Sequence, residues 1–332
     1  MSPEADRKAI AALEILARLY APIQSVLAEV DTMYRAELSS DDKYISNLLE
    51  YIEGYSGKKL RPALLLLAGK ACGELTKDHI ILGAVSEMLH TATLVHDDIL
   101  DDALLRRKRK SINALAGNEV SVLLGDHIFS HAFEISLNCS TSYGAKEFSR
   151  AMAKTCFGEI MQVHNRNNFE LTEADYFKII EGKTAELYAT SAMIGAHYSG
   201  ANEKVSKALY DYGMSLGRAF QIMDDLLDLR GSEDLVGKTL GSDIEKGKPT
   251  LPLIHHLSSV TGEAREDSLT LARNNEREAL ANKLLQTNSF EYAQHKAYSI
   301  ISEAKAGLEV LEKPEMKSLL HDVADFVLSR EL

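Results

Sequence analysis

Proline is missing from the whole middle of this chain. Six prolines occur among the 332 residues, and none of them lies between Pro62 and Pro249. Because proline lacks the backbone N–H and its ring clashes with the preceding turn, such a gap favours nearly continuous helix. Apolar residues in this stretch recur at spacings of three and four, and no segment shows a convincing strand-like alternation. The sequence therefore predicts an all-α protein, a single domain over residues 1–332 that forms one large helical bundle with a central cavity.

The same periodicity predicts the extent of individual helices. The segments with helical spacing are 5–34, 42–54, 60–72, 77–102, 119–137, 145–165, 172–197, 203–230 and 288–310. Residues 230–250 form the longest irregular segment and are rich in glycine, serine and charge, so we expect a functional loop there. Residues 256–332 show amphipathic helical pattern without a recognisable motif.

Charge and composition exclude several classes of protein. The formal net charge is −12, which argues against a nucleic-acid partner. No apolar run approaches 18 residues, and the first residues lack a basic segment followed by an apolar one, so we expect neither a transmembrane helix nor a signal peptide. Cys72, Cys139 and Cys156 are odd in number and lack metal-ligand spacing, which predicts reduced, buried thiols in a cytoplasmic protein.

Two acidic pentads of the form D-D-x-x-D interrupt the apolar pattern, at Asp97–Asp101 and Asp224–Asp228. In each pentad the first and last aspartate lie on one helix face about 5–6 Å apart. Two like charges at that separation repel by roughly 3 kcal/mol at an effective dielectric constant of 20. Magnesium removes this repulsion, because it binds through a few carboxylates, waters and substrate phosphates. Two facing acidic clusters therefore predict a multi-magnesium site for a diphosphate, although a single cluster could also belong to a solvated helix face.

Basic residues accompany these carboxylates. The run Arg106-Arg107-Lys108-Arg109 follows the first pentad, and Lys238, Lys246 and Lys248 follow the second on the irregular segment. Guanidinium and ammonium groups beside bound magnesium would clamp a diphosphate. A further cluster, Lys58-Lys59-Leu60-Arg61, begins an apolar helix and is equally consistent with an ordinary helix start. Lys183 lies in an apolar helix, where a lone lysine more often reaches solvent than takes part in catalysis.

Taken together, these motifs resemble those of the trans-type polyprenyl diphosphate synthases. The resemblance covers about residues 55–255. It rests on Gly57 to Pro62, His90 to Asp101 with Arg106-Arg107, Gly125-Asp126, Lys183-Thr184, Phe220-Gln221 to Asp228, and Gly237-Lys238 through Lys248-Pro249-Thr250. The run from His90 to Asp98 resembles the long-chain, octaprenyl-like branch in particular. The resemblance implies the isoprenoid synthase fold and a homodimer.

The resemblance also implies roles for individual residues. About three Mg²⁺ ions would be bound by Asp97, Asp101 and Asp224, with Asp98 and Asp228 in support. Isopentenyl diphosphate would be bound by Lys58, Arg61, His90 and Arg107. The allylic diphosphate would be contacted by Arg106, Lys183, Thr184, Gln221, Lys238 and Lys248. The predicted catalytic set is Asp97, Asp101, Lys183, Asp224 and Lys238.

Two positions depart from the family pattern. Ser56 stands where the family usually has a glycine, and Lys108 stands where a glycine usually follows the two arginines. The first substitution is expected to change little. The second is expected to alter the turn after the helix, because glycine reaches positive φ freely and lysine does not.

The activity that the resemblance implies is head-to-tail condensation. The C–O bond of the allylic diphosphate breaks, the double bond of isopentenyl diphosphate attacks the resulting cation, and a proton leaves, with released pyrophosphate as the base. Residues on the Asp97 side of its helix, counted backwards, are Thr93, Ala92, Leu89, Ser86 and Val85. The absence of a bulky aromatic residue just below the metal site implies a long product. Phe129 or Phe133 would stop its growth, although both residues are equally well read as core aromatics.

Other readings stay open at this point. The product could be as short as farnesyl or geranylgeranyl diphosphate. A class I terpene cyclase shares the all-α fold and one D-D-x-x-D motif, but its second metal motif usually contains asparagine and serine or threonine. A non-catalytic subunit of a hetero-oligomeric synthase would typically lose one or both acidic motifs. A helical bundle with two acidic surface patches would have no catalytic role.

Overall fold

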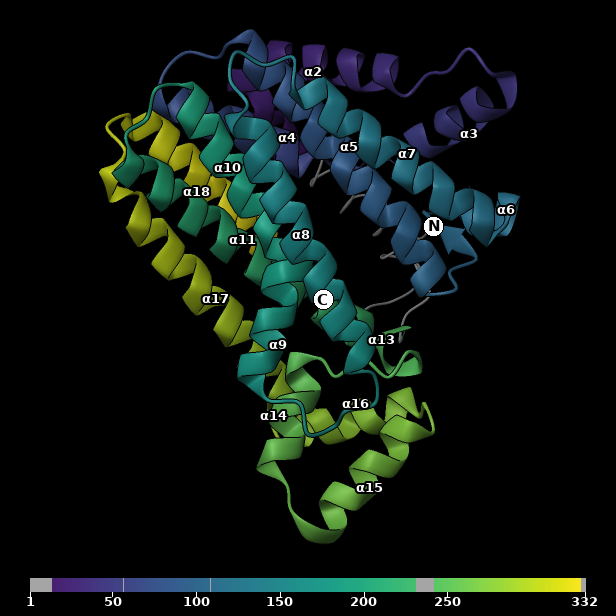
Figure 1. Ribbon diagram of the computed structural model, residues 1–332. Coiled ribbons are helices and arrows are strands. Elements are labelled where there is room, and N and C mark those ends of the chain that lie inside the picture. Colours follow the sequence, from purple (N-terminus) through teal and green to yellow (C-terminus); the bar gives the residue numbers. More distant parts are fainter. Residues whose placement is uncertain (1–13, 56, 108, 231–241, 330–332) are drawn as a thin grey trace.

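The computed structural model describes residues 14–55, 57–107, 109–230 and 242–329, and in these ranges the protein is almost entirely helical (Figure 1). Residues 14–20 are helical and lead into the short 3₁₀ turn η1 (Ala21–Ile23). The remaining helices are α2 (Gln24–Glu37), α3 (Lys43–Glu53), α4 (Leu60–Cys72), α5 (Lys77–Leu100), α6 (Ile112–Ala116), α7 (Asn118–Ser136), α8 (Tyr143–His164), α9 (Glu173–Ile180), η2 (Glu181–Ala185), α10 (Glu186–Tyr198), α11 (Glu203–Arg230), α13 (Ser242–Glu245), α14 (Leu251–Ser259), α15 (Gly262–Arg273), α16 (Arg277–Gln286), α17 (Ser289–Gly307), η3 (Leu308–Val310) and α18 (Pro314–Leu328).

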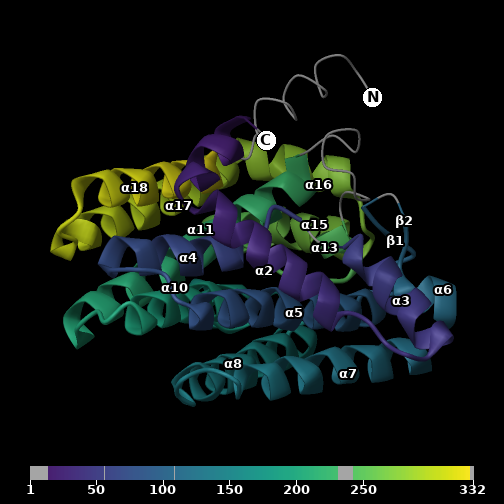
Figure 2. The same cartoon turned by 90° about the horizontal axis from the view of Figure 1, so that it is seen from above.

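The long helices pack in layers. Seen from above, α7 and α8 form one outer layer, α10, α5 and α4 lie next to it, and α17 and α18 lie towards the opposite side (Figure 2). The closest helix pairs are α10 with α11 and α4, α5 with α7, and α11 with α17. The shorter helices α14, α15 and α16 gather at one end of the bundle (Figure 1). The all-α class predicted from the proline gap is therefore confirmed, while the central cavity stays a prediction.

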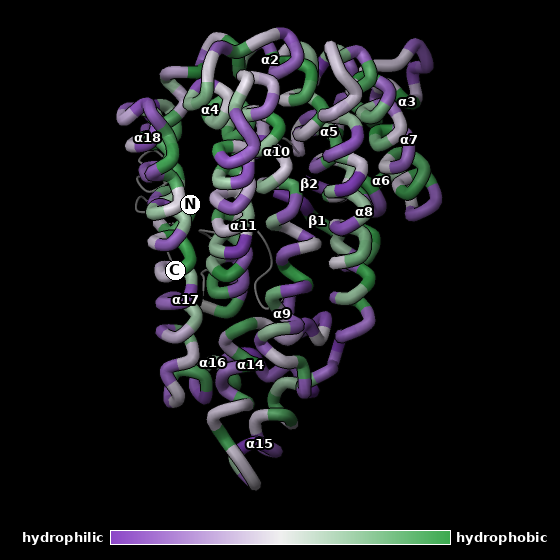
Figure 3. The backbone as a smooth tube through the Cα atoms, turned by 60° about the vertical axis from the view of Figure 1, so that its left-hand side comes forward, coloured by the Kyte–Doolittle hydropathy of each residue, from purple (hydrophilic) through white to green (hydrophobic). Residues whose placement is uncertain are grey.

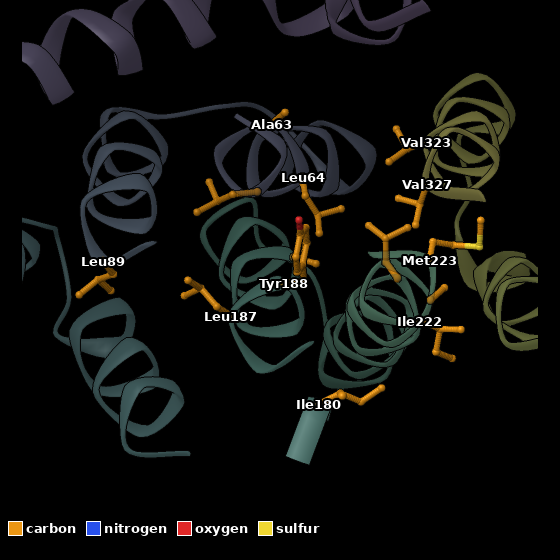
Figure 4. Packing of buried hydrophobic residues seen from close by; sticks show 14 of the residues in the cluster. Ala63, Leu64, Leu89, Ile180, Leu187, Tyr188, Ile222, Met223, Val323 and Val327 are labelled. Atoms are coloured by element: carbon orange, nitrogen blue, oxygen red, sulfur yellow. The ribbon is translucent and has the colours of Figure 1, made fainter. Parts of the chain in front are cut away.

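Hydrophobic residues hold these layers together. Hydrophobic and hydrophilic residues alternate along the bundle helices, as the three- and four-residue spacing requires (Figure 3). Leu64 of α4 and Tyr188 of α10 are both 1% exposed and lie next to each other in the core (Figure 4). Met223 of α11 and Val327 of α18 are equally buried in the same cluster. This packing fixes α4, α10 and α11, which carry much of the site described below.

The predicted helix bounds hold best for the inner helices. The segments predicted at 60–72 and 203–230 coincide with α4 and α11. The helix predicted over 5–34 is interrupted at η1, where Pro22 begins a 3₁₀ turn, and it continues to Glu37. The helix predicted over 172–197 contains η2, one turn of π-helix, between α9 and α10. The two-residue strands β1 (Leu105–Arg106) and β2 (Arg109–Lys110) were not predicted, because two residues are too few to show alternation.

One prediction about the cysteines was wrong. All three thiols are free, but Cys156 is exposed and Cys72 and Cys139 are only half-buried. Cys156 belongs to α8, a helix of an outer layer of the bundle (Figure 2). The helices that the structure describes include none that is long and apolar enough to cross a membrane.

Candidate active site

The two acidic pentads converge through a lysine of the loop that follows the second one. The first pentad ends α5, with Asp101 as its C-cap, and the second lies near the end of α11. Lys248 Nζ donates to Asp101 Oδ2 at 2.8 Å and lies 3.8 Å from Asp243 Oδ1. The backbone N–H of Asp243 in turn donates to Asp228 Oδ2 at 3.1 Å. Asp101 of the first pentad and Asp228 of the second are thus linked by three short contacts, which pass through Lys248 and Asp243.

Negative charge accumulates where the pentads meet. The pKa of Asp243 is raised to about 7, mainly by burial and by the charge of Asp228. The charges of Asp224 and Asp101 make smaller contributions in the same direction. At Asp101 burial acts in the same direction, but the charges of Lys248, Lys183 and Arg166 outweigh it and lower the pKa of this carboxyl. Carboxylates from two helices therefore share one region, with Lys248 as a direct partner.

The second aspartate of the first pentad is directed away from this region. Asp98 is 1% exposed, and both of its carboxylate oxygens accept from Arg106 Nε at 2.9 Å. A second guanidinium nitrogen of Arg106 lies 2.7 Å from Asp98 Oδ1, and the Tyr55 hydroxyl also hydrogen-bonds this carboxylate. The turn at the end of α5 makes this contact possible, because Asp102 has a φ of 45° and the N–H of Ala103 donates to the Asp98 carbonyl at 2.8 Å, so the chain reverses before Arg106. Asp98 is therefore the partner of Arg106 in this structure.

The second aspartate of the second pentad is equally buried but has neutral partners. Asp225 accepts from the Tyr176 hydroxyl at 2.7 Å and from Gln221 Nε2 at 2.8 Å. The Gln221 carbonyl oxygen accepts from the Thr184 hydroxyl at 2.7 Å. Burial, with the nearby charges of Asp243 and Asp224, raises the pKa of Asp225 well above its usual value. The predicted contacts Thr184 and Gln221 thus belong to one chain of hydrogen bonds that ends at Asp225.

Lys183 projects from the π-helical turn η2 into the same region. Its Nζ lies 2.6 Å from Glu159 Oε1 and donates to Gln162 Oε1 at 3.0 Å, both on α8. Burial lowers the pKa of Lys183, but the charges of Asp97, Glu159 and Asp101 outweigh this and raise it. π-Helical turns occur frequently at functional sites. Contrary to the ordinary expectation for a lone lysine in a helix, Lys183 is held among carboxylates.

The turn between α8 and α9 fixes the loop that carries Lys248. The N–H of Asn167 donates to the Gly247 carbonyl at 2.7 Å, and Gly247 has a φ of +63°. A Cβ at Gly247 would lie 2.2 Å from Asn167 Oδ1, so only glycine fits there. Lys246 Nζ donates to Asp102 at 3.2 Å, which joins the loop to the end of α5. Lys238, which the sequence also placed on this loop, lies outside the described residues, as do Ser56 and Lys108.

A second, basic cluster lies beside the first pentad. Burial, with the positive charges of Arg61, Arg106 and Arg107, lowers the pKa of His90 well below its usual value. The guanidinium of Arg61 stacks over the Tyr188 ring at 4.4 Å. A neutral His90 surrounded by three arginines is a suitable binding site for an anion.

The start of α4 contributes to this cluster unevenly. A Cβ at Gly57 would lie 2.3 Å from Arg107 Nη2, which shows how closely this arginine approaches the loop before α4. Lys58 Nζ lies 4.9 Å from the ring of Phe326 on α18. Lys59 has a φ of 50° and forms an ion pair with Asp31 of α2, which indicates a structural role. In the part of the chain with described side chains, Arg61 Nε is buried without a hydrogen-bond partner, and an anion's oxygen would satisfy it.

The sequence did not single out several residues of the site. Glu159 and Gln162 lie on α8, a helix without a recognised motif, and Arg166 follows the end of that helix. Arg166 Nη2 donates to Asp101 at 3.2 Å. Tyr176 lies on α9 and is 3% exposed. The three-residue spacing of Glu159 and Gln162 places them on one helix face, which was the available signal. Nothing in the sequence pairs that face with Lys183.

The carboxylates suit hard divalent cations without forming a finished cage for them. Carboxylate oxygens are the ligands that Mg²⁺ and Ca²⁺ prefer. Within the described ranges, no three acidic, histidine or cysteine side chains come close enough to hold a metal ion by themselves. Burial, followed by the charge of Asp228, raises the pKa of Asp243 to about 7, and bound cations would oppose this increase. This arrangement fits Mg²⁺, which is usually bound by one or two carboxylates together with substrate phosphates.

Comparison with known proteins agrees with this geometry. A family model described as Polyprenyl synthetase matches residues 42–287. The octaprenyl diphosphate synthase of Escherichia coli (strain K12) is 34% identical over 309 residues, which cover 92% of this chain and 96% of that protein. The geranylgeranyl diphosphate synthase of Methanosarcina mazei is also 34% identical, over 298 residues that cover 85% of this chain and 88% of that protein.

The fold comparison gives the same family. A crystal structure of a polyprenyl synthase from Caulobacter crescentus CB15, complexed with calcium and isoprenyl diphosphate, matches with a TM-score of 0.90 at 31% identity, covering 96% of this chain and 98% of that one. The family uses divalent metal ions. With two converging acidic pentads, a basic anion site and this likeness along most of its length, the chain belongs to the polyprenyl synthetase family and is a polyprenyl diphosphate synthase, a prenyltransferase of the isoprenoid synthase fold.

Proposed function

We propose that this enzyme adds isopentenyl diphosphate head-to-tail to an allylic diphosphate and makes a long-chain, all-trans polyprenyl diphosphate. The observation that carries the proposal is the convergence of the pentads, with Lys248 bound to Asp101 at 2.8 Å and close to Asp243, which contacts Asp228. The active unit is one domain over residues 1–332.

Magnesium is the proposed cofactor, at about three ions per active site. Asp97 and Asp101 would hold ions on the α5 side, and Asp224 with Asp228 would hold ions on the α11 side. Asp98 supports this set indirectly, because its carboxylate is bound to Arg106. When bound, the ions neutralise the diphosphate and stabilise the charge that develops on it as the C–O bond breaks.

The basic residues divide between the two substrates. Isopentenyl diphosphate is assigned to the cluster around His90, with Lys58, Arg61 and Arg107. The positive charges of the arginines around His90 and the buried, unpaired Arg61 Nε support this assignment. The allylic diphosphate is assigned to Arg106, Lys183, Thr184, Gln221, Lys238 and Lys248. Lys183 and Lys248 support it best, because both already lie among the carboxylates.

These side chains perform three tasks during the reaction. The ammonium groups of Lys183 and Lys248 stabilise the departing pyrophosphate. The arginines around His90 hold isopentenyl diphosphate so that its double bond faces the allylic cation. The apolar helices below the site exclude water, which would otherwise quench the cation. Released pyrophosphate takes the proton that leaves when the new double bond forms.

The face of α5 below the first pentad supports a long product. Ala92 and Leu89 are fully buried, and neither is a bulky aromatic. His96, one turn above Ala92, lies 5.8 Å from the Phe129 ring of α7, so this face is turned towards α7. Each added isoprene unit buries five carbons, worth roughly 4 kcal/mol at about 0.8 kcal/mol per methylene. Phe129 and Phe133 are both half-buried against the core and remain the predicted stop.

Product analysis tests the proposal directly. The purified chain is incubated with Mg²⁺, farnesyl diphosphate and radiolabelled isopentenyl diphosphate, and the products are measured by mass spectrometry. We expect label in prenyl diphosphates longer than twenty carbons. Labelled products that stop at fifteen or twenty carbons would favour the shorter-chain alternative. Cyclised products without label would indicate a terpene cyclase.

We also propose a homodimer, formed through α7 and α8. Phe157, Ile160 and Val163 of α8 are 63%, 65% and 40% exposed, and Val122 and Leu123 of α7 are exposed as well. The α8 residues recur every three positions and so form one apolar strip along the helix. The helix itself lies in an outer layer of the bundle (Figure 2). Light scattering should give a molar mass twice that of one chain. In the Ile160→Asp variant the molar mass should fall to that of a single chain.

A further inference from the structure

Two ion pairs of opposite polarity join α8 to the segment 181–186. Glu159 of α8 pairs with Lys183 at 2.6 Å, while Lys154 of α8 pairs with Glu186 at 2.8 Å. The Lys183–Glu159 pair is largely buried, with side-chain exposures of 15% and 18%. Lys154 is 57% exposed. The two pairs fasten the same elements together, but the electrostatic influence of the first pentad is found at the Lys183–Glu159 pair, where Asp97 acts on both members.

The backbones at this junction are in close contact. A Cβ at Gly158 would lie 2.4 Å from the backbone nitrogen of Lys183, and a Cβ at Gly182 would lie 2.7 Å from the backbone carbonyl oxygen of Lys154. The π-helical turn η2 occurs at this point. Because the main chains of α8 and η2 cannot shift relative to each other, the position of the Lys183 ammonium depends on its side-chain partners. Those partners are Glu159 and Gln162.

Lys183 has competing attractions. The charges of Asp97 and Asp101 act on its ammonium in addition to that of Glu159. Lysine has a flexible four-carbon stem, so a lysine released from α8 would move towards the pentad carboxylates. There it would neutralise the carboxylates that the proposed function assigns to metal ions.

We propose that Glu159 is a positioning residue that holds the Lys183 ammonium back from Asp97 and Asp101. The metal-binding carboxylates then stay available, and the ammonium faces the bound diphosphate. Gln162 supports the same position through its hydrogen bond to Lys183 at 3.0 Å. This inference rests on the proposed function, because it assumes that Asp97 and Asp101 bind metal.

The experiment measures metal binding rather than turnover. Mg²⁺ is titrated calorimetrically into wild-type enzyme and variants that are saturated with inorganic pyrophosphate. For Glu159→Gln we expect the half-saturating Mg²⁺ concentration to rise roughly tenfold, because the released ammonium repels the ion. Glu186→Gln is the matched control, since it weakens the other ion pair between the same elements. It should leave the Mg²⁺ concentration unchanged.

The double variant Glu159→Gln/Lys183→Met separates positioning from damage to the fold. If the competing ammonium causes the effect, its removal should return Mg²⁺ binding close to that of the wild type. Weak binding that persists in the double variant would overturn the inference, as would equal effects of Glu159→Gln and Glu186→Gln. Thermal unfolding of each variant accompanies the titration. Wild-type enzyme that fails to bind Mg²⁺ and pyrophosphate would instead contradict the proposed function.

Discussion

The two acidic pentads have the same sequence pattern but different surroundings. At the first, the buried Asp98 is paired with the guanidinium of Arg106. At the second, the donors to the buried Asp225 among the described residues are the neutral Tyr176 and Gln221, and burial and the neighbouring Asp243 raise its pKa well above the usual value. Burial raises the pKa of Asp98 as well, but the guanidinium of Arg106 opposes this increase, whereas the partners described for Asp225 carry no charge.

This difference shows that the same motif is built in two ways. After α5 the chain folds back and brings the guanidinium of Arg106 to the buried carboxylate of Asp98. At α11 hydrogen bonds from neutral side chains hold the carboxylate of Asp225 in place, and the charges of Asp243 and Asp224 act to raise its pKa. Loss of a metal ligand should therefore lower activity similarly at the two pentads. Loss of the buried aspartate should lower the free energy of unfolding by different amounts.

The largest expected effect is on activity. Asp101→Asn and Asp224→Asn should each lower kcat by about 10²–10³-fold, because each removes charge that stabilises the transition state through bound metal. Asp211→Asn is the matched control, since Asp211 lies on the same helix as Asp224 and pairs only with the exposed Lys207 among the contacts described. Steady-state assays at saturating Mg²⁺ measure the effect. Near-normal turnover in either pentad variant would contradict the assigned roles.

The next effect is on folding stability and separates the two pentads. Asp98→Asn should lower the free energy of unfolding by about 3 kcal/mol, because it leaves the largely buried Arg106 charge without its partner. Asp225→Asn should lower it by only about 1 kcal/mol, because an amide oxygen can still accept from Tyr176. Urea unfolding of both variants in the absence of metal measures the difference. Equal losses would show that the two environments are equivalent.

Part of this site could be predicted because it depends on short-range spacing. The i and i+4 relation placed the outer aspartates of each pentad on one face. The grouping of His90, Arg61 and Arg107 came from the family resemblance, and in the structure the charges of both arginines act on His90. The helix periodicity gave α4 and α11 their observed bounds.

The remainder depends on contacts between distant elements. Arg106 reaches Asp98 because the turn after α5 reverses the chain, and Tyr176 reaches Asp225 from a separate helix. The π-helical turn at Lys183 accompanies the close approach of Gly158, which no local pattern records. Among the C-terminal helices, α17 was predicted by the spacing over 288–310, whereas α15, α16 and α18 were expected only as amphipathic pattern, because they carry no motif that fixes their packing.

A change just below the first pentad tests how far the site extends along α5. Ala92→Tyr should shorten the product by one or more isoprene units, because Ala92 shares a helix face with His96, which contacts α7. The added ring should also destabilise the fold by about 1–3 kcal/mol if no space receives it. Mass analysis of products gives the chain length. Unchanged lengths would mean that the growing chain does not pass Ala92.

The smallest effect is a pH dependence that sharpens the contrast between the buried aspartates. Because the folded protein raises the pKa of Asp225, its charged form is disfavoured by folding. The stability associated with the protonated carboxyl is complete below the unfolded pKa of about 4 and is lost as pH rises towards the folded pKa. Asp225→Asn cannot ionise and escapes this loss. In metal-free buffer, the melting temperature of Asp225→Asn relative to wild type should therefore improve steadily as pH rises from 5 to 8. A difference that stays constant, or moves the other way, would mean that Asp225 is already ionised at low pH and is as well balanced as Asp98.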